Sequence, residues 1–326
     1  MRATIRLAAL IACGLALLGA AAIARAFDLQ GHRGARGLAP ENTLAAFEQA
    51  LAIGVTTLEM DAAITADGVV VISHNPALNH VITRDAQGRW LGGVGPLISS
   101  LTLAQLQAFD VGRIDPASSY ARQFPDQAGR DGERVPTLAA VFARVDALGA
   151  KAVRFNIETK IDPTRPAETL APEPFVRALL AAVDAAGMSG RVTIQSFDWR
   201  TLALVQRLAP AIPTSYLTAR GARFDTLADG TWTAGMKLAD YPDVARMVKA
   251  AGGAIWSPRY QDLGARDVAE AHALGLQVIP WTVNDRADAA RLIEWGVDGL
   301  ISDRPDLMRE VMRSRGIALP ARVPPR

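Results

Sequence analysis

Short apolar runs alternate with longer segments of helical period along most of this 326-residue chain, and that alternation limits the folds available to it. The pattern is typical of βα units arranged around a parallel sheet. Eight units can be counted, with strands predicted at residues 29–34, 56–64, 153–160, 191–197, 213–218, 254–260, 277–283 and 299–304. Helices are predicted between them at residues 43–53, 137–148, 174–186, 199–208, 241–251, 265–274 and 286–295.

Eight such units in about 280 residues predict an α/β fold of the closed (β/α)8 TIM-barrel type. A doubly wound open sheet is the alternative. It is disfavoured because no G-x-G-x-x-G follows the first strand and because polar residues are spread over many strand ends. We therefore expect one barrel domain over residues 27–318.

The alternation breaks between Pro76 and Pro136, where glycines punctuate a segment of weak periodicity. A segment of this length exceeds an ordinary βα loop. It predicts an insertion after the second strand, over residues 76–136, preceded by an extra strand at residues 69–73 and lying over the barrel mouth. Residues 319–326 contain three prolines and are predicted to form a loose tail.

The first 26 residues have the features of a signal peptide rather than of a folded element. Arg2 and Arg6 precede an apolar run over residues 7–23, and A-R-A at residues 24–26 supplies a cleavage site. A membrane anchor is the alternative, but this run lies at the lower limit for spanning a bilayer. We expect a mature chain that starts at Phe27, is periplasmic or secreted, and has no stable membrane anchor.

Composition excludes several kinds of function for the mature chain. The only cysteine, Cys13, lies in the leader, and an apolar run that continues past it fits an h-region better than a lipoprotein box. Disulfides, thiol nucleophiles and cysteine-based zinc sites are thereby excluded after cleavage. Of the 35 basic residues three lie in the leader, so the mature chain is near neutral against 33 acidic residues. That balance disfavours nucleic acid as a partner.

Acidic residues are embedded in two of the predicted strands. Glu59 and Asp61 are two positions apart, so both side chains point to one face, and Glu158 stands in the same relation to Lys160. A solvated edge or an ordinary ion pair with Lys160 would be the simpler reading. The apolar flanks of both strands instead indicate buried carboxylates, which repel one another unless a cation neutralises them. Oxygen ligands favour one hard divalent cation, Ca²⁺ or Mg²⁺.

Two of the four histidines follow strands at the expected mouth of the barrel. His32 ends the first strand and His74 ends the run V-V-V-I-S at residues 69–73, so either could transfer protons near neutral pH. His80 lies in the insertion and His272 on a helix, where surface or packing roles are expected. Together with Arg33 and Lys160, the first two histidines provide the charge and proton transfer that cleavage of a phosphodiester requires.

The longest motifs resemble those of the glycerophosphodiester phosphodiesterase family, in its exported bacterial type. H-R-G-A-R-G-L-A-P-E-N-T-L-A-A-F at residues 32–47 and L-E-M-D-A-A-I-T-A-D-G-V-V-V-I-S-H-N-P at residues 58–76 look like its two signature stretches. Shorter matches follow in order: N-I-E-T-K at 156–160, Q-S-F-D at 195–198, P-W-T-V-N at 280–284 and D-G-L-I-S-D-R-P at 298–305.

This resemblance implies a role for each candidate residue and a small-molecule substrate. The implied roles are metal ligation by Glu59, Asp61 and Glu158, acid/base catalysis by His32 and His74, and substrate binding by Arg33, Lys160, Gln195 and Trp281. For Gln195 and Trp281, a strand-end amide and a core tryptophan remain alternative readings. Glu41 and Asn42 follow Pro40 and are interpreted as the cap of a helix.

The resemblance also implies the reaction, which is hydrolysis of a glycerophosphodiester to sn-glycerol 3-phosphate and an alcohol. Two alternatives stay open. One is a phospholipase D-like activity on lysophospholipids or sphingolipids, which related barrels with a similar site possess. The other is a catalytically silent binding protein. The second is disfavoured because both histidines and all three acids are present.

Overall fold

The computed structural model describes residues 26–222 and 224–324. The predicted signal peptide therefore lies outside the described residues, apart from Ala26. Eight parallel strands form one sheet in the order β10, β9, β6, β5, β4, β2, β1, β11. The strands are β1 Asp28–Gly31, β2 Thr57–Ile64, β4 Arg154–Thr159, β5 Val192–Ser196, β6 Thr214–Thr218, β9 Ile255–Pro258, β10 Gln277–Val278 and β11 Gly299–Ser302.

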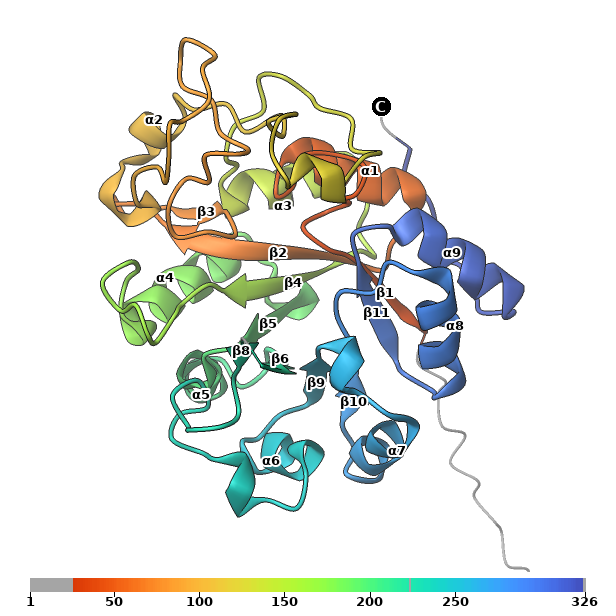
Figure 1. The fold of residues 1–326 in the computed structure, drawn as a ribbon. Coiled ribbons are helices and arrows are strands. Elements are labelled where there is room, and N and C mark those ends of the chain that lie inside the picture. Colours follow the sequence, from red (N-terminus) through yellow and green to blue (C-terminus); the bar gives the residue numbers. More distant parts are fainter. Residues whose placement is uncertain (1–25, 223, 325–326) are drawn as a thin grey trace, which may run out of the picture.

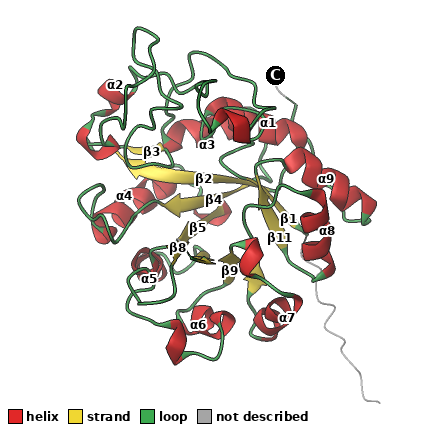
Figure 2. Cartoon of the chain, in the orientation of Figure 1, coloured by secondary structure: helices red, strands yellow, loops and turns green. Residues whose placement is uncertain are grey.

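Backbone hydrogen bonds across the seam between β10 and β11 bring the sheet close to a closed barrel. The amide of Asp298 donates to the carbonyl of Val278 at 2.9 Å, and that of Ile301 donates to Pro280 at 3.0 Å. The helices surround the strands, as Figures 1 and 2 show. The predicted (β/α)8 barrel is therefore confirmed, with every predicted strand present.

The outer helices of the barrel are α1 Leu44–Ile53, α3 Leu138–Ala147, α4 Pro172–Ala185, α5 Trp199–Leu208, α6 Val244–Ala250, α7 Ala265–Ala273, α8 Arg286–Glu294 and α9 Pro305–Ser314. Side chains at the N-caps accept backbone hydrogen bonds and fix where helices begin, as Thr43 does for α1 and Asp198 for α5. Helix α9 was not among the predicted helices, although Pro305 occupies its first turn. Within the part of the chain described here, no helix is long and apolar enough to cross a bilayer.

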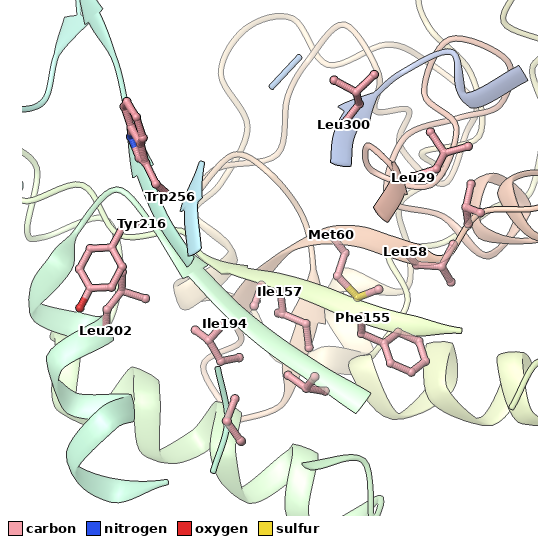
Figure 3. Packing of buried hydrophobic residues seen from close by; sticks show 14 of the residues in the cluster. Leu29, Leu58, Met60, Phe155, Ile157, Ile194, Leu202, Tyr216, Trp256 and Leu300 are labelled. Carbon is pink, nitrogen blue, oxygen red and sulfur yellow. The ribbon is translucent and has the colours of Figure 1, made fainter. Parts of the chain in front are cut away.

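Alternate residues of each strand face the helices or the barrel interior. Figure 3 shows Leu58 and Met60 of β2 near Phe155 of β4, all of them fully buried in the layer between strands and helices. Burying one such side chain stabilises the fold by about 1.5–3 kcal/mol. Their neighbours in sequence, including Glu59, point the other way, so the apolar layer fixes which side chains enter the barrel.

The segment over residues 76–136 packs beside the barrel as a unit with its own apolar cluster. The predicted extra strand is present as β3 Val70–Ile72, and it pairs antiparallel with β2. Helix α2 Leu103–Leu106 and the rest of the segment bury Leu78, Ile98 and Val111. Gln127 donates to the carbonyl of Arg36 at 2.7 Å, so the segment contacts the first loop of the barrel.

The chain after α9 returns along the outside of the barrel. The amide of Val323 donates to the carbonyl of Leu51 at 2.9 Å, and Arg309 donates to the carbonyl of Pro320 at 2.7 Å. Leu319 and Val323 also pack against the main core. These contacts fasten the predicted tail to the barrel as far as Val323.

Candidate active site

A cavity of about 200 Å³ opens at the C-terminal ends of the barrel strands. This is the end at which barrel enzymes place their active sites. Eight of the nine predicted site residues line it, together with other side chains: His32, Arg33, Arg36, Glu59, His74, Glu158, Lys160, Gln195, Phe197, Leu217, Trp281, Thr282 and Ile301. The ninth, Asp61, is 1% exposed and lies against Arg33.

The three predicted metal acids converge in the interior. Strands β2 and β4 pair so that Asp61 stands opposite Glu158. Glu59 precedes Asp61 by two residues on β2, so its side chain also points into the barrel. One carboxylate oxygen from each of the three lies within 4.8 Å of the others, and all three residues are buried. Asp61 Oδ1 has no hydrogen-bond partner among the described residues. A buried carboxylate oxygen without a donor fits a site for a hard divalent cation.

The other oxygens of these acids are held by fixed donors. Glu59 accepts from the backbone amide of Arg33 at 2.8 Å and from Gln195 Nε2 at 2.7 Å. Asp61 Oδ2 accepts from Asn42 Nδ2 at 2.8 Å. Lys160 Nζ donates to Glu158 Oε1 at 2.9 Å. Such outer contacts orient carboxylates before a metal binds.

Burial and mutual repulsion make this cluster unfavourable as three free anions. Burial raises the pKa of Glu59 well above its usual value, and the charge of Asp61 adds to that rise. Burial also raises the pKa of Glu158, to about 7, although Lys160 opposes the shift. For Asp61 burial acts in the same direction but is outweighed by neighbouring positive charge, so its pKa is lowered. A bound cation would let all three ionise together.

His32 is backed by a carboxylate that no strand-pattern argument assigned. Its Nδ1 lies 2.7 Å from Asp303 Oδ1, while its Nε2 lies 3.9 Å from Glu59 Oε2. Asp303 in turn accepts from Arg36 at 2.7 Å and 3.1 Å and from Asn284 at 2.7 Å. Burial lowers the pKa of His32, while the charge of Asp303 acts against that shift. The carboxylate therefore orients the ring and stabilises its protonated form.

His74 has the opposite surroundings, because a cation contacts its ring. Nδ1 lies 3.0 Å from Asn75 Oδ1, and Lys160 Nζ lies 3.1 Å from Nε2. With the ammonium as donor, Nε2 is the unprotonated nitrogen of a neutral ring. Burial first, and then the charges of Arg33 and Lys160, lower the pKa of His74 well below its usual value.

The loop after β1 is bent so that it can hold both Arg33 and Asn42 beside the acids. Arg33 adopts φ +49° and Asn42 φ +57°, a region that non-glycine residues rarely occupy. Gly34 has φ +86°, and a Cβ there would lie 2.6 Å from the backbone of Ala46. The strained backbone therefore lies in the loop whose residues contact Glu59 and Asp61, and such strain is common at functional sites.

The interpretation of Glu41 and Asn42 as a helix cap is wrong. Thr43 caps α1, because its side chain accepts from the amide of Ala46. Glu41 instead accepts from Arg33 Nη1 at 2.8 Å and from the hydroxyl of Tyr120, and Asn42 binds Asp61. The two residues therefore belong to the surroundings of the site.

Gln195 and Trp281 also line this cavity. Gln195 comes from β5 and is 2% exposed. Trp281 Nε1 donates to the carbonyl of Ser257 at 3.0 Å, and its half-buried ring meets Phe197 edge to face at 5.4 Å. An adjoining cavity of about 380 Å³ is lined in part by Phe197, Phe224, Trp232 and Trp281. It shares His74, Glu158 and Lys160 with the first cavity.

Sequence reasoning missed Asp303, Arg36 and Asn284 as parts of the site. Asp303 directly follows β11, so the strand-end rule applied to the first strands would have identified it. Arg36 carries no strand-end signal, because it lies in the loop after β1. His80 and His272 do not line either of these two cavities. His272 pairs with Asp298 on the surface at 2.9 Å.

Comparison with known proteins relates the chain to a single family. The model of the glycerophosphoryl diester phosphodiesterase family matches residues 32–307. A glycerophosphodiester phosphodiesterase of Bacillus subtilis is 30% identical over 286 residues, which are 86% of this chain and 85% of the relative.

Solved structures agree with that match. A protein of Silicibacter pomeroyi, provisionally named a glycerophosphoryl diester phosphodiesterase, superposes with a TM-score of 0.81 at 38% identity, covering 90% of this chain and 95% of its own. A phosphodiesterase of Oleispira antarctica, solved with its product sn-glycerol-3-phosphate, has a TM-score of 0.64 at 23% identity and covers 88% of this chain and 96% of its own. At that identity the second likeness supports the fold alone.

Proposed function

Because this chain belongs to the glycerophosphoryl diester phosphodiesterase family and is an enzyme of that family, we propose that it hydrolyses glycerophosphodiesters to sn-glycerol 3-phosphate and an alcohol. The observation that carries the proposal is the buried triad of Glu59, Asp61 and Glu158 beside two histidines. Family membership supports the reaction class, and the geometry supports the assignment of the groups that would perform it.

The three acids would hold one divalent cation, Ca²⁺ or Mg²⁺. Asp61 Oδ1, which has no hydrogen-bond donor among the described residues and lies 3.8 Å from Lys160 Nζ, fits a hard cation, as does the all-oxygen donor set. When bound, the cation would supply positive charge to neutralise the nonbridging oxygens of the phosphate. Arg33 and Lys160 line the same cavity and would bind those oxygens from the protein side. Gln195 and Trp281 would line the remainder of the substrate site.

The surroundings of the two histidines suggest different roles in proton transfer. Lys160 contacts Nε2 of His74, so that ring is neutral and could accept a proton from the nucleophile at Nε2 once the ammonium turns to the phosphate. Asp303 contacts Nδ1 of His32 and offsets part of the effect of burial, so this ring is the better suited of the two to carry a proton and donate it from Nε2 to the leaving alkoxide. We therefore assign His74 as the base and His32 as the acid.

The decisive experiment is an assay for released glycerol 3-phosphate over a panel of glycerophosphodiesters and intact lysolipids. Hydrolysis of the glycerophosphodiesters is expected in the presence of Ca²⁺ or Mg²⁺. Binding without turnover would instead indicate a catalytically silent protein. If alcohol is released from the lysolipids and not from the glycerophosphodiesters, the substrate is a lysolipid.

The second candidate, a phospholipase D-like action on lysophospholipids or sphingolipids, is favoured by one observation. Four aromatic side chains line the cavity next to the phosphate site, and Phe224 among them is 40% exposed. An exposed aromatic wall suits an apolar part of a substrate. Activity that rises with acyl chain length would support this candidate, whereas activity independent of chain length would favour water-soluble diesters.

The domain boundaries and the location of the enzyme remain our proposals. We infer that residues 1–26 are removed, that residues 27–318 form the catalytic domain and that the mature enzyme works outside the cytoplasm. The basic start, apolar run and A-R-A sequence support this. Mass spectrometry of the purified protein should give Phe27 as its first residue, without lipid; an acylated Cys13 would contradict the proposal.

A further inference from the structure

A line of three amide side chains crosses the barrel interior and connects Asp28 with Glu59. Gln30 Nε2 donates to Asp28 Oδ2 at 2.9 Å. Asn156 Nδ2 donates both to Gln30 Oε1 and to Gln195 Oε1, each at 2.8 Å. Gln195 Nε2 then donates to Glu59 Oε1 at 2.7 Å. All five residues are buried, and Gln30, Asn156 and Gln195 are no more than 3% exposed.

The direction of every bond in this line follows from its two ends. With a cation bound to the three acids, as proposed above, Glu59 is ionised, and an ionised carboxylate only accepts hydrogen bonds. Gln30 must then present its NH₂ to Asp28 and Gln195 its NH₂ to Glu59. Both glutamine carbonyls are then left facing the centre. Two buried carbonyls that face one position require a group with two N–H bonds between them.

Asn156 meets that requirement with a single nitrogen. Its NH₂ carries two hydrogens, one for each glutamine carbonyl. Its own Oδ1 has no hydrogen-bond partner among the described residues. Aspartate has the same shape but offers only acceptors when ionised, and leucine offers neither donors nor acceptors.

We propose that Asn156 is a positioning residue for the metal site: by fixing the orientation of the Gln195 amide, it keeps an N–H donor on Glu59 and directs that carboxylate toward Asp61 and Glu158. The inference rests on the proposed role of Glu59 as a metal ligand. Asn156 itself does not line the catalytic cavity and acts through Gln195. Donors to a ligating carboxylate set metal affinity even though they do not contact the metal.

Substitution of Asn156 by aspartate should disturb this orientation without changing the volume of the side chain. Because the side chain at position 156 then offers only acceptors, the Gln195 amide should rotate so that its NH₂ points to position 156 and away from Glu59. The Gln195 carbonyl would then face the Glu59 carboxylate. We expect N156D to weaken binding of the metal by about tenfold or more, as loss of outer contacts does at metal sites. Gln195→Met, which removes the donor directly, should weaken binding to a similar extent.

The test is isothermal titration calorimetry with Ca²⁺ and with Mg²⁺ on the purified mature protein, with thermal unfolding measured in parallel. A double variant separates positioning from general loss of stability. If Asn156 acts through Gln195, N156D should have little further effect on metal affinity in the Gln195→Met background. Additive losses in the double variant would contradict the proposal.

A matched control is Gln206→Leu, which removes a partly buried amide outside the barrel interior. Gln206 donates to Thr214, Tyr216 and Gly252 at 2.9–3.0 Å, so its loss should lower the unfolding temperature. Its metal affinity should equal that of the wild type. If the wild type binds neither cation, the proposed metal site fails; if the wild type binds and N156D binds equally well, only the positioning role fails.

Discussion

The two ends of the same barrel interior differ in what they offer to a ligand. The larger cavity, about 730 Å³, lies at the N-terminal end of the strands and is lined by polar side chains such as Thr193, Ser215 and Gln277. The smaller one, about 200 Å³, lies at the C-terminal end with the acids and histidines. If volume identified the active site, the first cavity would be chosen.

The two ends differ in whether their buried carboxylates have hydrogen-bond donors for both oxygens. At the N-terminal end, Asp28 accepts from Gln30, Thr56 and Thr57 and pairs with Arg154 at 3.0 Å. At the C-terminal end, Asp61 keeps an oxygen without a donor. Satisfied charges stabilise a fold, whereas buried charges without donors require a ligand. A buried carboxylate oxygen without a donor, rather than volume, therefore identifies the reactive end.

Removal of the metal should have the largest effect on activity, and it should act through the C-terminal end alone. EDTA or EGTA should abolish activity, and Ca²⁺ or Mg²⁺ should restore it, because three converging acids otherwise repel one another. Glu59→Gln and Asp61→Asn should each raise the metal concentration needed for half-maximal activity. Asp146→Asn, which alters a surface carboxylate that pairs with Arg191, should leave that concentration unchanged. Full activity of a chelated, metal-free sample would refute the metal role.

The histidines should give the next largest effect. His32→Ala and His74→Ala should each lower kcat by about 100-fold or more, because a positioned proton-transfer group is lost, while metal binding survives. His80→Ala and His272→Ala serve as controls and should change kcat little. With a substrate whose leaving group is p-nitrophenol, the loss of kcat in His32→Ala should be smaller than the loss in His74→Ala, since that leaving group scarcely needs protonation. The reverse order would exchange the two roles.

The site could be predicted from sequence where strand periodicity determines geometry. Glu59 and Asp61 are two apart in a buried strand, so both had to enter the barrel, and His32 had to lie at the mouth because it ends β1. The eight strands were predictable for the same reason. Their apolar residues are contiguous in sequence and are constrained by burial on both faces.

Contacts between segments distant in sequence could not be predicted in this way. His32 and Asp303 are 271 residues apart, and no local pattern pairs them. Asn42 resembled a cap because Pro40 precedes it, yet tertiary contact with Asp61 determines its role. The amide line has the same origin, because Gln30, Asn156 and Gln195 come from three different strands.

Asp303→Asn should show how the surroundings of the reactive end affect stability. Burial would raise the pKa of Asp303, but the positive charges of His32 and Arg36 outweigh it and lower that pKa. The ionised form therefore stabilises the fold above the usual pKa of about 4, and this contribution is lost as the pH falls. At pH 7 the free energy of unfolding of the variant should be lower by about 3 kcal/mol, because Arg36 loses its charged partner.

The difference between wild type and Asp303→Asn should then shrink when urea unfolding is repeated below pH 4. Asp28→Asn provides a comparison at the other end of the barrel. A stability difference for Asp303→Asn that stayed constant from pH 7 to pH 3 would show that shape, rather than charge, accounts for it.

The smallest effect is expected from Arg154→Ala at the N-terminal end. The side chain of Arg154 is 51% exposed, and ion pairs of that kind contribute about 0–1 kcal/mol. Asp28 would keep its bonds from Gln30, Thr56 and Thr57, so no buried charge is left without a donor. Urea unfolding should shift by less than about 1 kcal/mol, and kcat and KM should be unchanged. A tenfold loss of kcat would instead mean that the two ends are coupled through the amide line, and the contrast between them would no longer hold.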